Sequence, residues 1–278
     1  MLRLRRNIYV ESGFHGVTVG AVVTSKGIIC IDTPTLPADA RKWRLRLEQL
    51  EADDIFFIIN TDHNRDRVVG NQWFDAPVIA HEQTYELMAG YSEVFKSHSI
   101  ESGGDHELAT DLIGVRTILP QVSYSDEFQL VVGGCTIELL HKPGATSGTS
   151  WVRFPEARVI FTGDTVFQKT HPFLNDAQID LWLENLVELR RAVYKGWIIV
   201  PGRDRPLDQT QLDYCIDYLR YLRRRLASLH RRGKPCSDAL KIAPALLERY
   251  PPRRDQYSLM KHRLEASLEE ACDALEVD

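Results

Sequence analysis

Residues 60–71 read NTDHNRDRVVGN and directly follow the apolar run IFFII at residues 55–59. A short, continuous apolar run is typical of a strand that is buried on both faces. Polar residues placed just after such a strand often carry function, because strand ends open into surface loops. We therefore expect this segment to help set the fold and to lie at a functional site.

Three later segments repeat this arrangement of a polar turn after an apolar strand. They are HKPGATSGT at residues 141–149, FTGDTVF at residues 161–167 and VPGRD at residues 200–204. An earlier segment, IDTP at residues 31–34, also leaves a predicted strand, and its proline discourages the strand from continuing. The chain thus carries five polar turns at predicted strand ends.

Hydrophobic periodicity predicts the remaining elements. Strands are predicted at residues 17–23, 28–31, 55–59, 78–80, 128–132, 135–141, 150–154, 159–161 and 197–200. Helices are predicted at residues 38–50, 82–91 and 179–193, and residues 97–111 are predicted to form a loop. Two strand-rich halves that are each followed by helices predict an α/β sandwich with four layers.

In this order and spacing, the five polar turns resemble those of the metallo-β-lactamase fold superfamily, over about residues 17–204. The resemblance implies a four-layer αββα sandwich over residues 1–204, with residues 205–278 as a C-terminal helical extension. It also implies a set of metal ligands. The family motif is His-x-His-x-Asp-His, then a His after Pro-Gly, an Asp, and a His after a second Pro-Gly. These residues hold one or two metals, usually zinc, which activate a water for hydrolysis.

This sequence departs from that motif at nearly every position. The residues at the seven motif positions are Asp62, Asn64, Asp66, Arg67, Ala145, Asp164 and Arg203. All five histidines are replaced, and only two of the family's carboxylates remain. A catalytic zinc needs about three protein ligands, with imidazole and thiolate preferred. Alanine cannot ligate, and arginine has no lone pair to give. We therefore expect a pocket at the former metal position, with no zinc and no other cofactor.

The charges of these residues suggest what replaces the metal. Asp62, Asp66 and Asp164 contribute three negative charges, and Arg67 and Arg203 contribute two positive charges. Bidentate arginine–carboxylate pairs can take the place of metal–carboxylate bonds. The charge balance therefore predicts that both arginines enter the pocket and pair with the aspartates.

Three other uses of this pocket stay open. The oxygen ligands of Asp62, Asn64, Asp66 and Asp164 suit a hard cation such as Mg²⁺, Mn²⁺ or Ca²⁺, although two nearby arginines disfavour it. Nearby histidines, such as His63 or His141, are a less favoured source of zinc ligands. Arg67, Arg203 and Lys142 are an alternative site for a small anion, because the planar guanidinium suits carboxylate and phosphate.

The last 74 residues are predicted to be helical, with two narrow apolar seams on either side of a break at Pro251 and Pro252. Such seams favour helices packed on the body of the protein, with a homodimer seam as the alternative. Residues 219–234 carry seven basic residues and no acid. We interpret this run as a solvated helix face balanced by the acidic tail. Contact with a polyanion is the alternative, but a net charge of −5 makes nucleic acid an unfavoured partner.

Composition narrows the class of protein. With 44% hydrophobic and 26% charged residues, the chain is neither disordered nor collagen-like. No apolar run approaches the ~20 residues that a membrane span needs, and no signal peptide is expected. Five widely spaced cysteines without a CxxC pair predict reduced thiols in a cytoplasmic protein.

These observations favour a metal-free pseudoenzyme or small-ligand-binding protein that kept the fold and lost the di-metal chemistry. One alternative is a hydrolase of ester, thioester, amide or phosphoester bonds that uses an atypical metal site. Another is an interaction protein that acts through residues 219–234. The fold by itself does not select a substrate.

Overall fold

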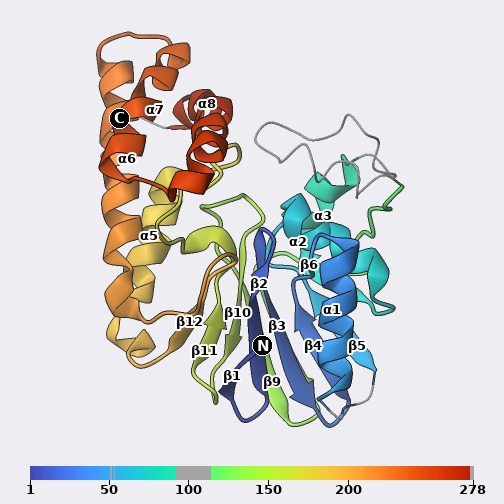
Figure 1. The fold of residues 1–278 in the computed structure, drawn as a ribbon. Helices are drawn as coiled ribbons and strands as arrows, with labels where there is room; N and C mark the ends of the chain where they lie inside the picture. The colour runs from blue at the N-terminus through green and yellow to red at the C-terminus, as the bar shows by residue number, and fades with distance from the viewer. Residues whose placement is uncertain (51, 53, 92–113, 276–278) are drawn as a thin grey trace.

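The computed structural model describes residues 1–50, 52, 54–91 and 114–275 (Figure 1). The loop predicted at residues 97–111 lies outside this range. The predicted αββα sandwich is confirmed: two sheets lie face to face, with helices on both outer sides and a C-terminal group of helices at one end.

The first sheet has seven strands in chain order, antiparallel from β1 to β4 and parallel from β4 to β7. They are β1 (Leu2–Arg5), β2 (Ile8–Phe14), β3 (Val17–Thr24), β4 (Gly27–Ile31), β5 (Ile55–Ile59), β6 (Val78–His81) and β7 (Val122–Tyr124). Because β4, β5 and β6 are parallel, the turns that follow them lie at one edge of the sheet. Sequence analysis missed β1 and β2, since the polar stretch at residues 11–13 interrupts the apolar pattern at a register shift in β2.

The second sheet has five strands in the order β12-β11-β10-β9-β8, antiparallel except for the parallel pair β11 and β12. They are β8 (Glu127–Val132), β9 (Cys135–His141), β10 (Ser150–Phe154), β11 (Val159–Phe161) and β12 (Ile198–Val200). Aliphatic and aromatic side chains of both sheets form one buried cluster between them, which includes Ile31, Ile59, Val152 and Phe161.

Helices cover the two outer faces. The α-helices are α1 (Pro37–Glu48), α2 (Arg65–Val68), α3 (Glu82–Ala89), α5 (Ile179–Leu189), α6 (Asp213–Arg231), α7 (Ala243–Arg249) and α8 (Tyr257–Asp273). Short 3₁₀ helices are η1 (Val69–Trp73), η2 (Gly163–Thr165), η3 (Ala192–Tyr194), η4 (Gln209–Gln211), η5 (Cys236–Ile242) and η6 (Arg254–Gln256). Figure 1 shows α1 beside the first sheet, and α5 and α6 on the opposite side of the molecule. The helix predicted at residues 179–193 ends earlier, at Leu189.

The C-terminal helices share a hydrophobic cluster with the second sheet's outer layer. Leu186 of α5, Leu222 of α6 and Leu264 of α8 are fully buried in one cluster.

Within the basic run at residues 219–234, Arg223 pairs with Asp180 of α5, with 3.3 Å between Nη2 and Oδ2. The division at residue 204 into two domains, and a homodimer through these helices, stay predictions. None of the described helices is both long and apolar enough to cross a membrane.

The prediction that all five cysteines are reduced is wrong for two of them. Cys236 and Cys272 form a disulfide, while Cys30, Cys135 and Cys215 are free. The two partners are 36 residues apart in the chain. They meet because η5 and α7 turn back so that α8 runs alongside η5, a long-range contact that cysteine spacing does not reveal.

We predict that Cys236→Ser lowers the free energy of unfolding by about 3–4 kcal/mol, because a cross-link over a loop of this length restricts the unfolded chain. Urea unfolding of the oxidised protein measures this loss. Cys135→Ser is the control, and its expected loss is about 1 kcal/mol or less. Equal losses in the two variants would contradict the assignment of the cross-link.

Candidate functional site

The candidate site is a network of charged side chains at one edge of the sandwich. Each member follows a strand: β4, β5, β11 or β12. We call it the Arg67 network, and its members are Asp32, Asp62, Asp66, Arg67, Asp164 and Arg203. The turn after β5 leads into α2, which carries Asp66 and Arg67. The short helix η2 carries Asp164.

Arg67 is the centre of the network and has no exposed side-chain surface. Its Nη1 lies 3.1 Å from Oδ2 of Asp62, and its Nη2 donates to Oδ1 of Asp164 at 2.6 Å. Nη1 also donates to the hydroxyl of Thr61 at 3.1 Å. The guanidinium therefore lies between the carboxylates of Asp62 and Asp164, which stand at two of the seven motif positions.

Arg203 approaches Asp164 from the turn after β12. Its Nε and Nη2 donate to Oδ2 of Asp164 at 3.3 and 3.2 Å, and it forms a second ion pair with Asp66. Its Nη1 also donates to the Gly16 carbonyl at 2.6 Å. Asn64 donates to the same Asp164 oxygen at 3.1 Å. The pairing of both arginines with the aspartates, predicted from charge balance, is thus confirmed.

The backbone leaves no spare room around the central guanidinium. A Cβ added at Gly202 would lie 2.4 Å from Nη1 of Arg67 and 2.8 Å from Oδ1 of Asp164. Real Cβ atoms essentially never approach other atoms so closely. Glycine at position 202 therefore has a packing reason: it lets the chain pass directly over the Arg67–Asp164 pair.

Two predicted pocket residues have other surroundings. Ala145 is buried in the hydrophobic cluster that includes Trp182 of α5. Lys142 pairs with Glu188, with 2.7 Å between Nζ and Oε2, and its ammonium lies over the Trp151 ring. Lys142 is therefore engaged with α5 and does not supply the free cation that the anion alternative assumed.

Sequence analysis missed Asp32, a member of the network, and Arg263, which lies close to Arg203. Asp32 is buried, accepts hydrogen bonds from the backbone and side chain of Thr61 at 2.8 and 2.7 Å, and lies 3.9 Å from Nη1 of Arg67. The position of Asp32 in the IDTP turn was the sequence signal that could have placed it at the site. Two guanidinium groups lie over the Phe173 ring. That of Arg263, from α8, is 3.9 Å from the ring centroid, and that of Arg203 is 4.9 Å from it. No local signal connected α8 with this site.

Including Asp32 changes the charge balance of the Arg67 network. Four carboxylates now face two guanidinium groups, which leaves two formal negative charges in excess. Burial raises the pKa of Asp62 to about 7, with the neighbouring carboxylates of Asp164 and Asp32 adding to the effect. Burial also raises the pKa of Asp32 to about 6. Proton uptake at these two groups therefore relieves the excess charge.

Asp164 behaves in the opposite way. Burial alone would raise its pKa, but the combined attraction of Arg203 and Arg67 and their hydrogen bonds hold the pKa well below its ordinary value. The same carboxylates raise the pKa of Arg67 further above its ordinary value, against the effect of burial. At neutral pH the central pair is thus a fixed cation and a fixed anion.

A match to the family model of the metallo-beta-lactamase superfamily covers residues 12–203, more than half of the chain. The chain belongs to the metallo-beta-lactamase superfamily. It is 29% identical over 189 residues to the 2,4-dinitroanisole O-demethylase subunit alpha of Nocardioides sp. (strain JS1661), covering 66% of this chain and spanning about half (51%) of that subunit. It is 21% identical over 230 residues to the metallo-beta-lactamase type 2 of Elizabethkingia meningoseptica, covering 78% of this chain and 83% of that protein.

Among solved structures, a metallo-beta-lactamase family protein from Thermus thermophilus superposes with a TM-score of 0.69 at 17% identity. The match covers 96% of this chain and 93% of that one. The inverting sec-alkylsulfatase Pisa1 from Pseudomonas sp. matches with a TM-score of 0.67 at 13% identity, over 98% of this chain and 49% of the sulfatase. At these identities the likeness establishes the shared fold, including the C-terminal region, and leaves activity open.

The metal that the superfamily implies does not fit this donor set. The space between Asp62 and Asp164 holds a guanidinium, which repels a second cation and donates no electron pair. In the described part of the chain, one cluster has three His, Cys or carboxylate ligand atoms within 4.8 Å of one another. It consists of His230, Cys236 and Cys272, which lie outside the Arg67 network. The hard-cation alternative gains no support from this arrangement of the carboxylates.

His63 and His141, the histidines considered as replacement zinc ligands, make other contacts. His141 stacks on His81 with 3.6 Å between ring centroids, and its Nε2 lies 2.8 Å from the Ser147 carbonyl. His63 lies near the Tyr91 ring, at 6.4 Å between centroids. A zinc site rebuilt from His63 or His141 gains no support from these positions.

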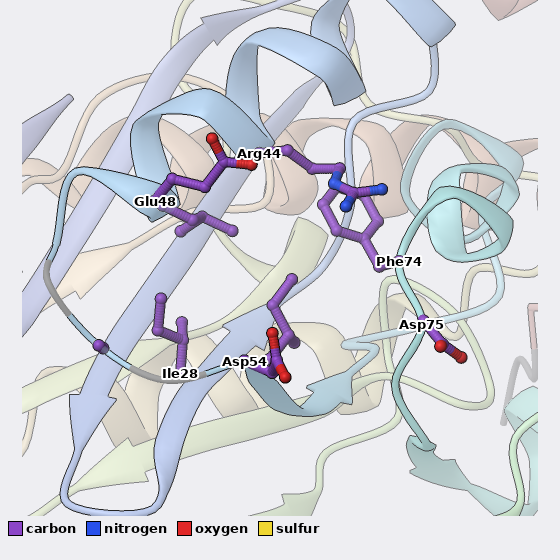
Figure 2. Close-up of a pocket in the computed structure, with 9 residues that line it drawn as sticks. Ile28, Arg44, Glu48, Asp54, Phe74 and Asp75 are labelled. Carbon is purple, nitrogen blue, oxygen red and sulfur yellow. The ribbon is translucent and has the colours of Figure 1, made fainter.

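The described residues also line a pocket of about 640 Å³, shown in Figure 2. Its lining includes Arg44 and Glu48 of α1, with Ile28 and Ile55 at the starts of β4 and β5. The Arg67 network follows the opposite, carboxyl ends of these strands. The pocket is therefore separate from the candidate site. It also lies away from the carboxyl ends, where ligands of parallel sheets usually bind.

Removing the central cation should be costly. We predict that Arg67→Met lowers the free energy of unfolding by about 3–5 kcal/mol at pH 8, because it leaves buried carboxylates without a partner. The loss should shrink at pH 5, where those carboxylates take up protons in the variant. Arg190→Met is the matched control: Arg190 pairs with Asp213 at 3.0 Å on the surface, and its expected loss is below about 1 kcal/mol.

The raised pKa of Asp62 gives a second prediction. Between about pH 4 and pH 7 the folded chain holds a proton that the unfolded chain has already released. The free energy of unfolding should therefore fall as pH rises through this window, and Asp62→Asn should reduce that slope. Chemical unfolding at half-unit pH intervals measures it. An unchanged slope in Asp62→Asn would show that Asp62 is not the group responsible.

Proposed function

We propose that this chain is a metal-free member of its superfamily, in which the guanidinium of Arg67 replaces the metal and hydrolysis through a metal-activated water has been lost. One observation carries the proposal: a fully buried guanidinium lies between Asp62 and Asp164, at 3.1 and 2.6 Å. A guanidinium stabilises the two carboxylates as a metal would. It differs from a metal because it has no open coordination position for a water.

The chemistry of the site supports this proposal. A catalytic metal lowers the pKa of its bound water so that hydroxide forms near neutral pH. Arg67 instead keeps its proton, since the surrounding carboxylates raise its pKa. The donors of Arg203 are also engaged, by Asp164, Asp66 and Gly16. The site thus offers neither a nucleophile nor a cation that is ready to receive an anionic substrate.

The proposed role is that of a non-catalytic binding or partner protein built on an enzyme fold. The relatives favour the hydrolase alternative instead, because the aligned proteins include an O-demethylase subunit and a metallo-beta-lactamase. In that case the substrate would carry an ester, thioester, amide or phosphoester bond. Activity assays therefore have to be designed to detect either outcome.

The sharpest test compares oxidised wild type with oxidised Arg67→Ala, because the Cys236–Cys272 disulfide then offers zinc no thiolate pair. Removing the guanidinium leaves an excess of carboxylates around a vacated space. We predict that Mn²⁺ or Zn²⁺ raises the melting temperature of Arg67→Ala, as binding to the folded state requires. Neither metal should change the melting temperature of wild type, which keeps Arg67. An equal rise in both proteins would contradict the proposal.

We further predict that the wild-type chain hydrolyses no generic ester, thioester, phosphoester or β-lactam substrate, with or without added Zn²⁺ or Mn²⁺. Inorganic phosphate should leave its melting temperature unchanged, because the guanidinium donors are already paired. Metal-dependent turnover that disappears in Asp164→Ala would overturn the proposal and establish the hydrolase alternative.

A further inference from the structure

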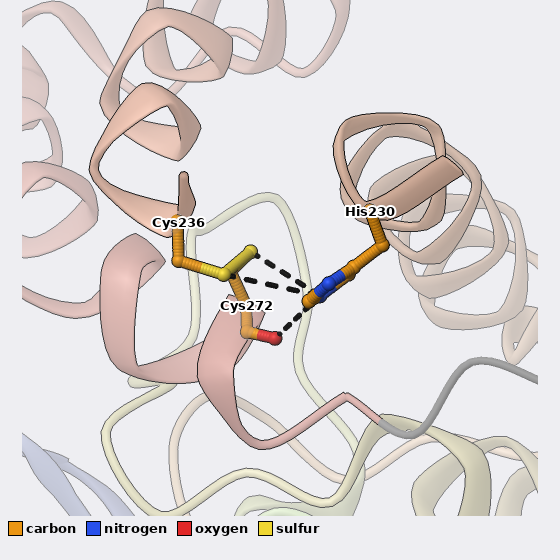
Figure 3. Close-up of a disulfide and its surroundings, with 3 residues drawn as sticks. All are labelled: His230, Cys236 and Cys272. Atoms are coloured by element: carbon orange, nitrogen blue, oxygen red, sulfur yellow. Dashed lines mark hydrogen bonds between the residues drawn. A yellow bond between two sulfur atoms is a disulfide. The ribbon is translucent and has the colours of Figure 1, made fainter. Parts of the chain in front are cut away.

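Three metal-ligating side chains meet at the C-terminal end of the fold. His230 comes from the last turn of α6, Cys236 begins η5, and Cys272 lies in the last turn of α8 (Figure 3). Nε2 of His230 lies 3.5 Å from Sγ of Cys272 and 3.8 Å from Sγ of Cys236. The two cysteines are joined by a disulfide.

These distances match the edges of a tetrahedral zinc centre. With bonds of about 2.3 Å to sulfur and about 2.0–2.1 Å to nitrogen, neighbouring N and S ligands lie about 3.5 Å apart. The imidazole is therefore already placed for such a centre relative to both sulfurs. Only the sulfurs, now bonded to each other, would have to separate. The Cα atoms, 5.5 Å apart, can stay in place while the side chains rotate.

We infer that the reduced chain binds one Zn²⁺ through Nε2 of His230 and the thiolates of Cys236 and Cys272, so that disulfide and metal are alternative states of the same cluster. A dithiol reductant supplies two electrons and two protons, becomes a disulfide itself, and leaves two thiols. Zinc then displaces both thiol protons to solvent. The fourth coordination position goes to water.

His230 is suited to this exchange. In the disulfide state its Nε2 lies 2.9 Å from the Cys272 carbonyl. As a zinc ligand, Nε2 gives up that contact and the ring carries its proton on Nδ1, the usual tautomer of a ligating imidazole. His230 and Cys236 are partly exposed whereas Cys272 is buried, so metal and reductant can enter from the His230 side.

The inference is independent of the proposed function, because it uses none of the Arg67 network. The disulfide joins the end of α8 to the start of η5, and zinc would join these two to each other and to the end of α6. The cross-link between these helices is then kept under reducing conditions whenever zinc is present, and it is lost only in the reduced, metal-free chain.

The test begins with wild-type protein that is reduced with a phosphine, desalted without oxygen and titrated with Zn²⁺ against a chromophoric chelator. We expect one equivalent of zinc bound per reduced chain and none per oxidised chain at the same chelator concentration. This comparison needs no substitution, and circular dichroism of the reduced chain checks that it stays folded. Cys135→Ser should behave as wild type, whereas Cys236→Ser, Cys272→Ser and His230→Gln should each bind zinc at least tenfold more weakly.

Titration with Co²⁺ identifies the ligands. A thiolate-to-cobalt charge-transfer band that appears in the reduced wild type and is lost in Cys236→Ser supports the site. Metal bound by the carboxylates of the Arg67 network would lack that band, so the two sites are distinguished. Zinc binding by the reduced wild type that is no tighter than that of Cys236→Ser would overturn the inference. Wild-type affinity in His230→Gln would overturn the three-ligand assignment.

Discussion

A guanidinium that is wholly removed from water has to be met by opposite charge and by hydrogen-bond acceptors. Arg67 is in this position, and the edge of the sandwich is organised around it. Asp62 and Asp164 contact its two terminal nitrogens, and Thr61 accepts a further hydrogen bond. Breaking such a buried pair costs far more than breaking a surface pair. The strand ends that supply these groups are therefore held in one relative arrangement.

Side-chain contacts also connect the Arg67 network with the C-terminal helices. Arg203 pairs with Asp164 on one side and rests on the Phe173 ring on the other. Arg263 of α8 covers that same ring and donates to the His171 carbonyl at 2.9 Å. Because Arg263 is buried close to Arg203, its pKa is lowered to about 10. Asp164, Arg203, the Phe173 ring and Arg263 thus connect the Arg67 network with α8, the helix that carries Cys272.

Local patterns predicted what depends on local physics. The five polar turns at strand ends identified the sandwich through their resemblance to the superfamily, and the charges of Arg67 and Arg203 predicted their partners. Three features escaped because they depend on distant contacts. Strand β2 pairs across a register shift, Arg263 arrives from the last helix, and Cys236 meets Cys272 only after η5 and α7 turn the chain back. Asp32 belonged to a recognised turn, yet its burial beside Arg67 could be seen only once β4 and β5 were paired.

The account rests on the claim that a guanidinium stands where the superfamily places metal. The most direct test is a crystal structure of the protein grown with excess Zn²⁺, with anomalous diffraction recorded at the zinc edge. The account predicts continuous density for the Arg67 guanidinium within hydrogen-bond distance of both Asp62 and Asp164, and no anomalous peak between them. An anomalous peak between these two carboxylates, with the Arg67 side chain turned away, would contradict it.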